Sequence, residues 1–425
     1  MIELFGRIFD ASYVCSDGVH QYLYRNMEPS SVDEALASPL ARDYTQVQDR
    51  TVADNRSVTL HKGKESLHFF YQANKRTLTV TTDALADALY DPANGADRVK
   101  NGKNSFAVMT LDYSKYTCKA GCDPKYDNNG LSYVLTLDDG RFIVYDGGYS
   151  YPRANDDEII YEFLRDNNRL GGKPVIAAWV LTHSHNDHYG AFTSFSERFA
   201  DRVILETVVA NTAPAYCYTK GHDPMLEDMT VFTKRFGAAT RQIRPHIGQM
   251  LYFGAVEIEV IHTHEQFHFN GLELNQENSA SLVTRVHMDG KTFFLAADAM
   301  EAVSVQMVEI YGAALKSDFF QINHHGNRGG KVELYEAIAP SYAFWNTSKY
   351  GLAKRTAGEP YPVGMPHAYD AMLNRKIFTE LGADHCFCAD DEVDLLSFDE
   401  NGNLLIEYYT IRKELLPERI PYTEE

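Results

Sequence analysis

One short stretch of this chain concentrates its chemistry: Thr182-His183-Ser184-His185-Asn186-Asp187-His188. It directly follows Val175–Leu181, whose continuous apolar character is typical of a buried β-strand, and it precedes a helix that we expect to run through Ala200. Three imidazoles and a carboxylate within six residues are rare in a chain with 16 histidines among 425 residues. We therefore interpret the stretch as a cluster of metal ligands at the end of a buried strand.

The spacing within this cluster predicts two metal ions. On an extended segment His183 and His185 point to the same face, so both can bind one ion. Asp187 and His188 lie where the chain turns into the helix, and they can reach a second ion. Zn²⁺ favours imidazole nitrogen and carboxylate oxygen. Two ions roughly 3.5–4 Å apart can share a hydroxide nucleophile at neutral pH.

A dinuclear site needs further ligands, and the sequence offers them at the ends of other expected strands. Asp298 follows an apolar strand at 292–296 and can bridge both ions with its two oxygens. His324 and His325 follow a strand at 318–322, and one of them should complete the second site. Taken alone, each of these residues would be interpreted as part of a turn. Beside the 182–188 cluster they become ligand candidates.

The chain divides into two sections by its pattern. Residues 1–105 form an α+β section in which we find no concentration of chemistry. Its expected elements are a helix at 31–40 and strands at 56–60, 67–73 and 77–82. From residue 106 onward, strands alternate with helices, which is typical of an α/β domain.

Two β-hairpins in the second section resemble each other. Each joins two apolar alternating strands through an Asp-Gly turn, which is the strongest short-range signal for a hairpin. The first, at 132–146, turns at Asp139-Gly140, and the second, at 281–298, turns at Asp289-Gly290. Each hairpin has an aspartate just past its second strand. This pattern suggests a duplicated αβ unit.

These motifs resemble those of the metallo-β-lactamase-fold superfamily. Asp146-Gly147-Gly148 resembles its first motif, and His183-x-His185-x-Asp187-His188 resembles its signature. Within the superfamily, the chain is similar to the competence-type branch related to the hydrolase domain of DNA-uptake proteins. The features that carry this likeness are residues 278–283, residues 295–299 and His324-His325-Gly326.

The resemblance covers about residues 106–425 and implies an α/β (α+β) fold, a four-layer αβ/βα sandwich. We therefore expect an N-terminal accessory α+β region at 1–105 and a hydrolase domain at 106–425. By the same resemblance, His183 and His185 hold the first metal, Asp187 and His188 hold the second, and Asp298 bridges them. A further carboxylate, Asp146, is expected to orient the ligands from outside the coordination sphere.

Two assignments stay open in the sequence. Most members of the superfamily complete the first metal with a histidine in a Gly-rich third motif. The candidates here are His262, His264 and Asn278, of which we favour His264 as the ligand, with Asn278 beside it. Spacing does not separate His324 from His325. We favour His325, adjacent to a glycine, as the metal ligand and His324 as an acid group.

The resemblance implies that water attacks an ester, amide or phosphodiester, with Asp187 holding the nucleophile and His324 protonating the leaving oxygen. Zinc is favoured, because redox di-iron members typically carry a carboxylate where this chain has His185; manganese and iron are the alternatives. We expect a phosphodiesterase-like hydrolase of a small or surface phosphoester. A lactonase or amidase comes second, and a non-catalytic metal-binding regulatory module is the rival from another class.

The charge of the chain narrows its partners. Its 59 acidic and 40 basic residues give a net charge of −19, which argues against a nucleic-acid partner held by a broad basic surface. A small-molecule phosphoester remains compatible with this charge, because two dications would add about +4 at the site. The longest apolar run, Val175–Leu181, is far shorter than the roughly 20 residues of a membrane span. With no visible signal peptide, we expect a cytoplasmic protein without membrane association, and the oligomeric state is open.

Overall fold

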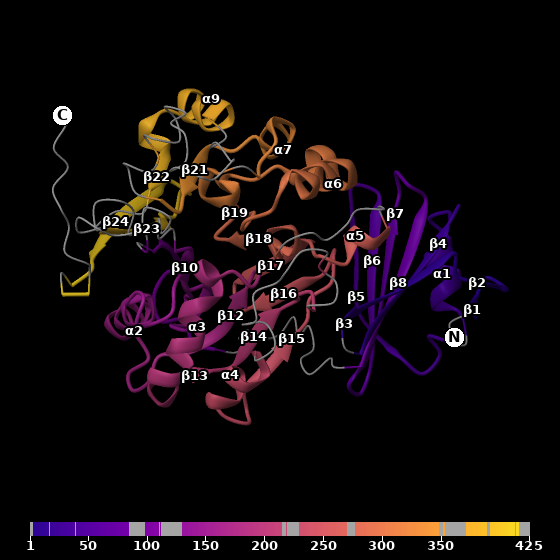
Figure 1. The fold of residues 1–425 in the computed structure, drawn as a ribbon, viewed down its shortest axis with the longest axis horizontal. Helices are drawn as coiled ribbons and strands as arrows, with labels where there is room; N and C mark the ends of the chain where they lie inside the picture. The colour runs from indigo at the N-terminus through magenta and orange to yellow at the C-terminus, as the bar shows by residue number, and fades with distance from the viewer. Residues whose placement is uncertain are drawn as a thin grey trace.

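The computed structural model describes residues 3–16, 18–38, 40–84, 98–109, 111, 130–214, 218, 229–269, 277–327, 329–347, 352, 371–388, 392–412 and 414–415. Figure 1 shows an N-terminal sheet at one end of the molecule, beside a larger body built on two central sheets. The candidate site lies in the larger body.

The N-terminal region forms a six-stranded antiparallel sheet in the order β3-β4-β8-β7-β6-β5. Its strands are β3 (Ala11–Ser16), β4 (Val19–Arg25), β5 (Thr45–Val52), β6 (Asn55–Lys62), β7 (Glu65–Gln72) and β8 (Thr77–Asp83). A short ribbon, β1 (Glu3–Leu4) with β2 (Arg7–Ile8), precedes it. The predicted helix is α1 (Ser31–Leu36), which ends earlier than expected. Its Val32 and Ala35 belong to the same buried apolar cluster as Val58 and Val80 of the sheet.

The first central sheet has nine strands, with the main order β15-β14-β12-β11-β10-β9-β23-β24 and β13 paired to β12. The strands are β9 (Ser105–Val108), β10 (Ser132–Thr136), β11 (Phe142–Asp146), β12 (Val175–Leu181), β13 (Ile204–Leu205), β14 (Thr207–Ala210), β15 (Arg241–Ile243), β23 (Glu392–Phe398) and β24 (Leu404–Thr410). The pairs from β11 to β15 are parallel, whereas β10 and β11 form the predicted hairpin.

The second central sheet has seven strands in the order β16-β17-β18-β19-β20-β21-β22. The strands are β16 (Met250–Phe253), β17 (Val256–His262), β18 (Val283–Met288), β19 (Lys291–Leu295), β20 (Phe319–Gln321), β21 (Tyr342–Trp345) and β22 (Cys386–Cys388). Strands β18 and β19 form the second predicted hairpin, and β19 to β22 are parallel. Both sheets therefore contain an antiparallel hairpin followed by parallel strands, which is the repeat that the sequence suggested.

Three apolar layers hold four layers of structure together. Alternate residues of β11 point to opposite faces of its sheet: Ile143 and Tyr145 pack against the other sheet, and Phe142 and Val144 pack against helices. The helices on that side are α2 (Asp156–Asp166), α3 (Asn186–Arg198) and α4 (Met229–Arg235), and those on the opposite side are α6 (Glu301–Tyr311), α7 (Val332–Ile338) and α9 (Ala371–Leu381) (Figure 1). A one-turn helix, α5 (Gln266–Phe269), follows β17. The predicted four-layer αβ/βα sandwich is confirmed.

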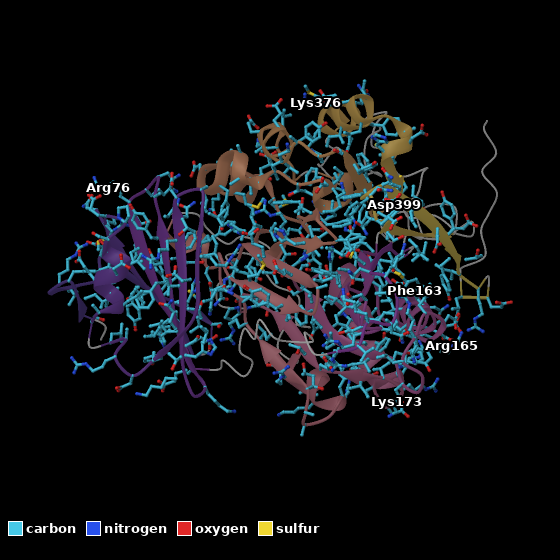
Figure 2. All side chains as sticks on the ribbon, turned by 180° about the vertical axis from the view of Figure 1, so that it is seen from behind. Arg76, Phe163, Arg165, Lys173, Lys376 and Asp399 are labelled. Atoms are coloured by element: carbon cyan, nitrogen blue, oxygen red, sulfur yellow. The ribbon has the colours of Figure 1, made fainter. Side chains whose placement is uncertain are left out.

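The side chains follow this layered arrangement. Figure 2 shows them filling the space between the layers, while the labelled Arg76, Lys173 and Lys376 lie at the periphery of the molecule. No helix in the described part of the chain combines the length and the apolar character needed to cross a bilayer.

The N-terminal sheet docks onto the edge strand of the second central sheet through buried polar contacts. The Gln48 amide donates to the Met250 carbonyl at 2.9 Å and accepts from the Met250 N–H at 2.8 Å. Ser57 Oγ donates to the Gly248 carbonyl at 2.8 Å. A Cβ atom on Gly248 would lie 2.7 Å from Ser57 Cβ, so this close approach requires glycine. Side chains of β5 and β6 thus satisfy backbone groups next to and within β16 that would otherwise be exposed at the sheet edge.

A buried charge cluster joins the same two parts of the molecule. His246 Nδ1 lies 2.9 Å from Glu265 Oε1, and His246 Nε2 lies 3.7 Å from Asp83 Oδ2 at the end of β8. Arg244 also contacts Asp83, at 3.3 Å. Burial alone would lower the pKa of His246, but Glu265 and Asp83 outweigh it and raise that pKa from 6.5 to about 9. A protonated His246 therefore sits between a carboxylate of each part.

This cluster predicts a pH-dependent stability. Because the folded-state pKa of His246 is raised, its contribution is fully present below pH 6.5 and is lost as the pH rises through 9. We expect the free energy of unfolding to fall over that interval by an amount on the order of 3 kcal/mol. His246→Gln should be less stable at pH 6.5 and should decline less than the parent, because only the part of the decline due to His325 and His188, whose pKa values are also raised, remains. Urea unfolding at several pH values measures both effects.

His20→Gln is the matched control, because His20 is an exposed histidine on β4 of the same sheet. This control should keep the stability decline of the parent protein. If His246→Gln shows the same decline as the parent, another group is responsible for it.

Candidate metal centre

Four strand ends bring the predicted ligands to one edge of the two central sheets. In the first sheet, β11 ends at Asp146, and β12 ends at Leu181 just before the 182–188 stretch. In the second sheet, β19 ends three residues before Asp298, and β20 ends shortly before a 3₁₀ turn at Asn323–Gly326. Ligands at the carboxyl ends of parallel strands therefore converge from both sheets.

The first cluster, which we call the Asp187 group, consists of Asp187, His188, Asp298 and His325. His188 Nε2 lies 3.2 Å from Asp298 Oδ1, and His325 Nε2 lies 3.4 Å from the same oxygen. His325 Nε2 is also 3.5 Å from Asp187 Oδ2. One potential ligand atom from each residue lies within 4.8 Å of all the others, so the four can surround one ion.

The second cluster, the His183 group, consists of His183, His185 and Asp298. His183 Nε2 lies 3.2 Å from His185 Nδ1 and 4.0 Å from Asp298 Oδ2. His324 Nε2 also faces this oxygen, at 3.7 Å. The two oxygens of Asp298 thus face different groups, Oδ1 the Asp187 group and Oδ2 the His183 group. This is the arrangement expected of a carboxylate that bridges two ions.

The residues present fit such ions. His188 Nε2, His325 Nε2 and Asp298 Oδ1 are buried and have no hydrogen-bond partner among the described residues. Buried polar atoms without a partner cost stability, and their convergence on one point suits a bound cation. Neutral imidazole nitrogens with carboxylate oxygens are the donor set of zinc sites, and manganese or iron accept the same ligands.

The electrostatics of the cluster point the same way. Burial alone would lower the pKa of His325, but Asp298 and Asp187 outweigh it and raise that pKa to about 9. The pKa of His188 is raised as well, chiefly by Asp298 against the effect of burial. The pKa of Asp298 lies well below its usual range, because the neighbouring imidazoles outweigh the effect of burial. Without a cation, protons on the histidines compensate the carboxylates, and metal binding would release them.

Asp146 holds the centre from outside both groups. Its Oδ1 accepts the Thr182 N–H at 2.8 Å, and its Oδ2 accepts the Thr182 hydroxyl at 2.7 Å. Oδ2 also lies 2.8 Å from His188 Nδ1. A proton on Nδ1 of His188 leaves Nε2 with its lone pair toward Asp298, which is the tautomer that a metal ligand requires.

Backbone strain concentrates at the same edge. Asp146, Ala297, His324 and His325 have φ values of 48°, 48°, 51° and 55°, in the left-handed region that favours glycine. Each such residue costs of order 1–3 kcal/mol, and they persist where the surroundings fix them, often at functional sites. His325 is fixed through its Nδ1, which donates to the Asn346 carbonyl at 3.2 Å.

The structure does not bring the other third-motif candidates into either group. His264 Nε2 faces Asn211 Oδ1 at 3.1 Å, and His262 Nε2 faces Gln306 Oε1 at 2.7 Å. Both histidines lie at the end of β17, whose following residues pack toward the N-terminal sheet through Glu265 and His246. Asn278 does reach the centre, since its Nδ2 lies 3.3 Å from His324 Nε2.

Two residues that contact the ligand histidines were not predicted from the sequence. Glu277 Oε2 lies 3.5 Å from His185 Nε2, and the Asn346 carbonyl holds His325. Glu277 could have been found as the carboxylate directly before Asn278. No signal pointed to Asn346, because a backbone carbonyl carries no residue-type information.

The sandwich and the two groups together define a class of proteins with a metal centre at the edge of an αβ/βα fold. A family model described as Metallo-beta-lactamase superfamily matches residues 126–215, which include Asp146 and the 182–188 stretch but not Asp298 or His325. The match covers less than half of the chain and shows that this segment is similar to the metallo-beta-lactamase superfamily. Among curated proteins, none matches the sequence significantly.

Several solved structures are similar at low identity. The metallo-beta-lactamase fold protein YhfI from Bacillus subtilis is 12% identical, with 67% of this chain and 97% of that chain covered and a TM-score of 0.39. CmlA, a diiron beta-hydroxylase from Streptomyces venezuelae, is 13% identical, with 68% and 53% covered and a TM-score of 0.38. Tm1679, a metal-dependent hydrolase of the beta-lactamase superfamily, is 11% identical, with 59% and 91% covered and a TM-score of 0.33. The hydroxylase and hydrolase activities in these names belong to those proteins.

Because Asp298 belongs to both groups, its substitution should weaken metal binding at both of them. Asp298→Asn keeps the side-chain size but removes the charge, so we expect the affinity for both ions to fall by more than about 100-fold. Metal content after reconstitution and gel filtration measures this, with circular dichroism to verify folding. Asp289→Asn, in the turn of the same hairpin, is the matched control and should bind metal normally. Retention of both ions by Asp298→Asn would place the bridging ligand elsewhere.

A second prediction concerns Asp146. Asp146→Asn leaves an amide where three donors now meet a carboxylate, so the free energy of unfolding of the metal-free protein should fall by about 1–3 kcal/mol. Metal affinity should fall by about 10–100-fold, because His188 loses the group that orients it. Urea unfolding and a metal competition assay measure the two effects. Unchanged metal affinity would show that other contacts orient His188.

Proposed function

We propose that this protein is a metal-dependent hydrolase with a dinuclear, zinc-type donor set, acting as a phosphodiesterase on a small or surface phosphoester. The observation that carries the proposal is the position of Asp298, whose two buried oxygens face two separate sets of histidines. A pair of metal sites accounts for a carboxylate that is shared in this way.

Bound ions would supply Lewis acidity and lower the pKa of a water to about 7. The exposure of each side chain indicates which of them can contact water or substrate. Asp187 has 21% of its side chain exposed, whereas Asp298 and His325 are buried. The Asp187 carboxylate can therefore orient an incoming water by accepting its hydrogen. His324, with 24% of its side chain exposed, lies on the His183 side, and its imidazolium form can give a proton to the leaving oxygen.

The charge of the centre allows an anionic substrate. The chain carries −19 overall, but two dications would add about +4 and so offset the carboxylates of Asp146, Asp187, Glu277 and Asp298. A phosphodiester suits this local charge, and the acidic remainder of the molecule disfavours a long polyanion such as nucleic acid. Membership of the competence-type branch, zinc as the ion and a cytoplasmic location without membrane association stay predictions.

The test is turnover of reporter substrates by protein reconstituted with zinc, manganese or ferrous iron. We expect bis(p-nitrophenyl) phosphate to be hydrolysed faster than a lactone or a β-lactam reporter. On a phosphodiester with an alkyl leaving group, which needs a proton to depart, His324→Gln should lower kcat by about 10²–10⁴-fold while metal content stays unchanged, because it removes a proton donor.

The other outcomes separate the rival functions. Preference for the lactone or the amide reporter would establish a lactonase or amidase instead. Two bound ions with no turnover of any reporter would favour the non-catalytic regulatory module. Cleavage of single-stranded or plasmid DNA at low salt would overturn the argument from charge.

A further inference from the structure

We infer that Glu277 is a positioning residue that holds His185 in the orientation needed to bind metal, and that the His183 group is consequently the weaker of two unequal sites. The inference rests on the dinuclear centre of the proposed function and adds how its second ion is controlled. It starts from the number of protein ligands. Among the residues that the structure describes, the Asp187 group offers four ligands and the His183 group three, with Asp298 common to both.

Each ligand histidine has a partner on the nitrogen that faces away from the centre. His188 has Asp146 at 2.8 Å, His325 has the Asn346 carbonyl at 3.2 Å, and His183 Nδ1 has the Thr182 hydroxyl at 3.1 Å. Such partners fix the tautomer and the ring orientation of a metal-binding histidine. His185 needs a corresponding partner on the nitrogen that faces away from the ion.

Glu277 occupies that position. His185 Nδ1 faces His183 Nε2 at 3.2 Å, inside the group, and His185 Nε2 faces Glu277 Oε2 at 3.5 Å on the other side of the ring. A carboxylate that accepts the Nε2 proton leaves the lone pair on Nδ1, toward the ion. Glu277 therefore acts through His185 rather than as a member of the ligand group.

His185 depends on this contact more than the other ligand histidines do. Its side chain is 30% exposed, whereas those of His183, His188 and His325 are at most 1% exposed. Packing fixes a buried ring, but an exposed ring retains rotamer freedom unless a partner holds it. The loss of Glu277 should therefore affect the His183 group and leave the buried Asp187 group intact.

The turn that carries Glu277 is anchored to the ligand loop. Glu277 begins a 3₁₀ turn, Glu277–Ala280, in which Asn278 faces His324 at 3.3 Å. Two residues past the turn, the Leu282 N–H donates to the Thr182 carbonyl at 2.9 Å. Glu277 is thus held at a fixed place relative to the loop that carries His185. The turn therefore supports the His183 group, as a third-motif histidine would, but without supplying a metal ligand.

The experiment is a metal titration with a chromophoric chelator as competitor. The parent protein should bind two Zn²⁺ ions with separable affinities. In Glu277→Gln, which keeps the size but removes the charge, the weaker affinity should fall by about 10–100-fold while the tighter affinity stays unchanged. Glu257→Gln, on β17, is the matched control and should leave both affinities unchanged. The Co²⁺ absorption spectrum of the fully loaded variant should keep the coordination number of the parent.

Three results would overturn the inference: equal affinities in the parent, no effect of Glu277→Gln on the weaker ion, or equal weakening of both ions. A change of coordination number in the Co²⁺ spectrum would also overturn it, because Glu277 would then be a ligand itself. The inference and the proposed function fail separately. Two unequal ions with the expected variant behaviour but no reporter hydrolysis would sustain the inference and refute the hydrolase.

Discussion

The centre of this molecule depends on one buried carboxylate, Asp298, and on what compensates its charge. An ionised group removed from water is costly unless it is paired. Histidines from both central sheets surround Asp298, and they come from strand ends that are far apart in the sequence. The two sheets must therefore meet at this edge for the charge to be compensated. The same need for positive charge makes the cluster a place where divalent cations can replace protons.

The internal repeat explains how two aspartates reach the same histidine. Asp146 ends the second strand of one hairpin, and Asp298 follows the second strand of the other. His188 lies between them, with Nδ1 2.8 Å from Asp146 and Nε2 3.2 Å from Asp298. The two corresponding hairpins thus contribute aspartates with different roles. One carboxylate orients a ligand, and the other faces both ion sites.

Much of this could be predicted from the sequence, because the strongest signals are local. Buried strands appear in the sequence as apolar runs, and Asp-Gly pairs indicate the hairpin turns. The histidines and the aspartate of the 182–188 stretch indicate metal binding. Strands β3 to β5 were not predicted, since their exposed and polar residues hide the alternation. The place of His264 could not be predicted, and the only sequence signal for Glu277 is its position directly before Asn278. Both depend on which way the chain turns after β17, and this is decided by tertiary packing rather than by local pattern.

The packing that decides it comes from the N-terminal sheet. After β17, Glu265 pairs with His246, which in turn faces Asp83 of that sheet. Asn211 donates to Glu265 at 3.1 Å and faces His264 at the same distance, so His264 belongs to this buried network rather than to the metal centre. Glu277, which reaches the centre from outside, also lies between β17 and β18 in the chain. The residues that contact the N-terminal region and the residue that faces His185 therefore both follow the same strand, β17, in the sequence.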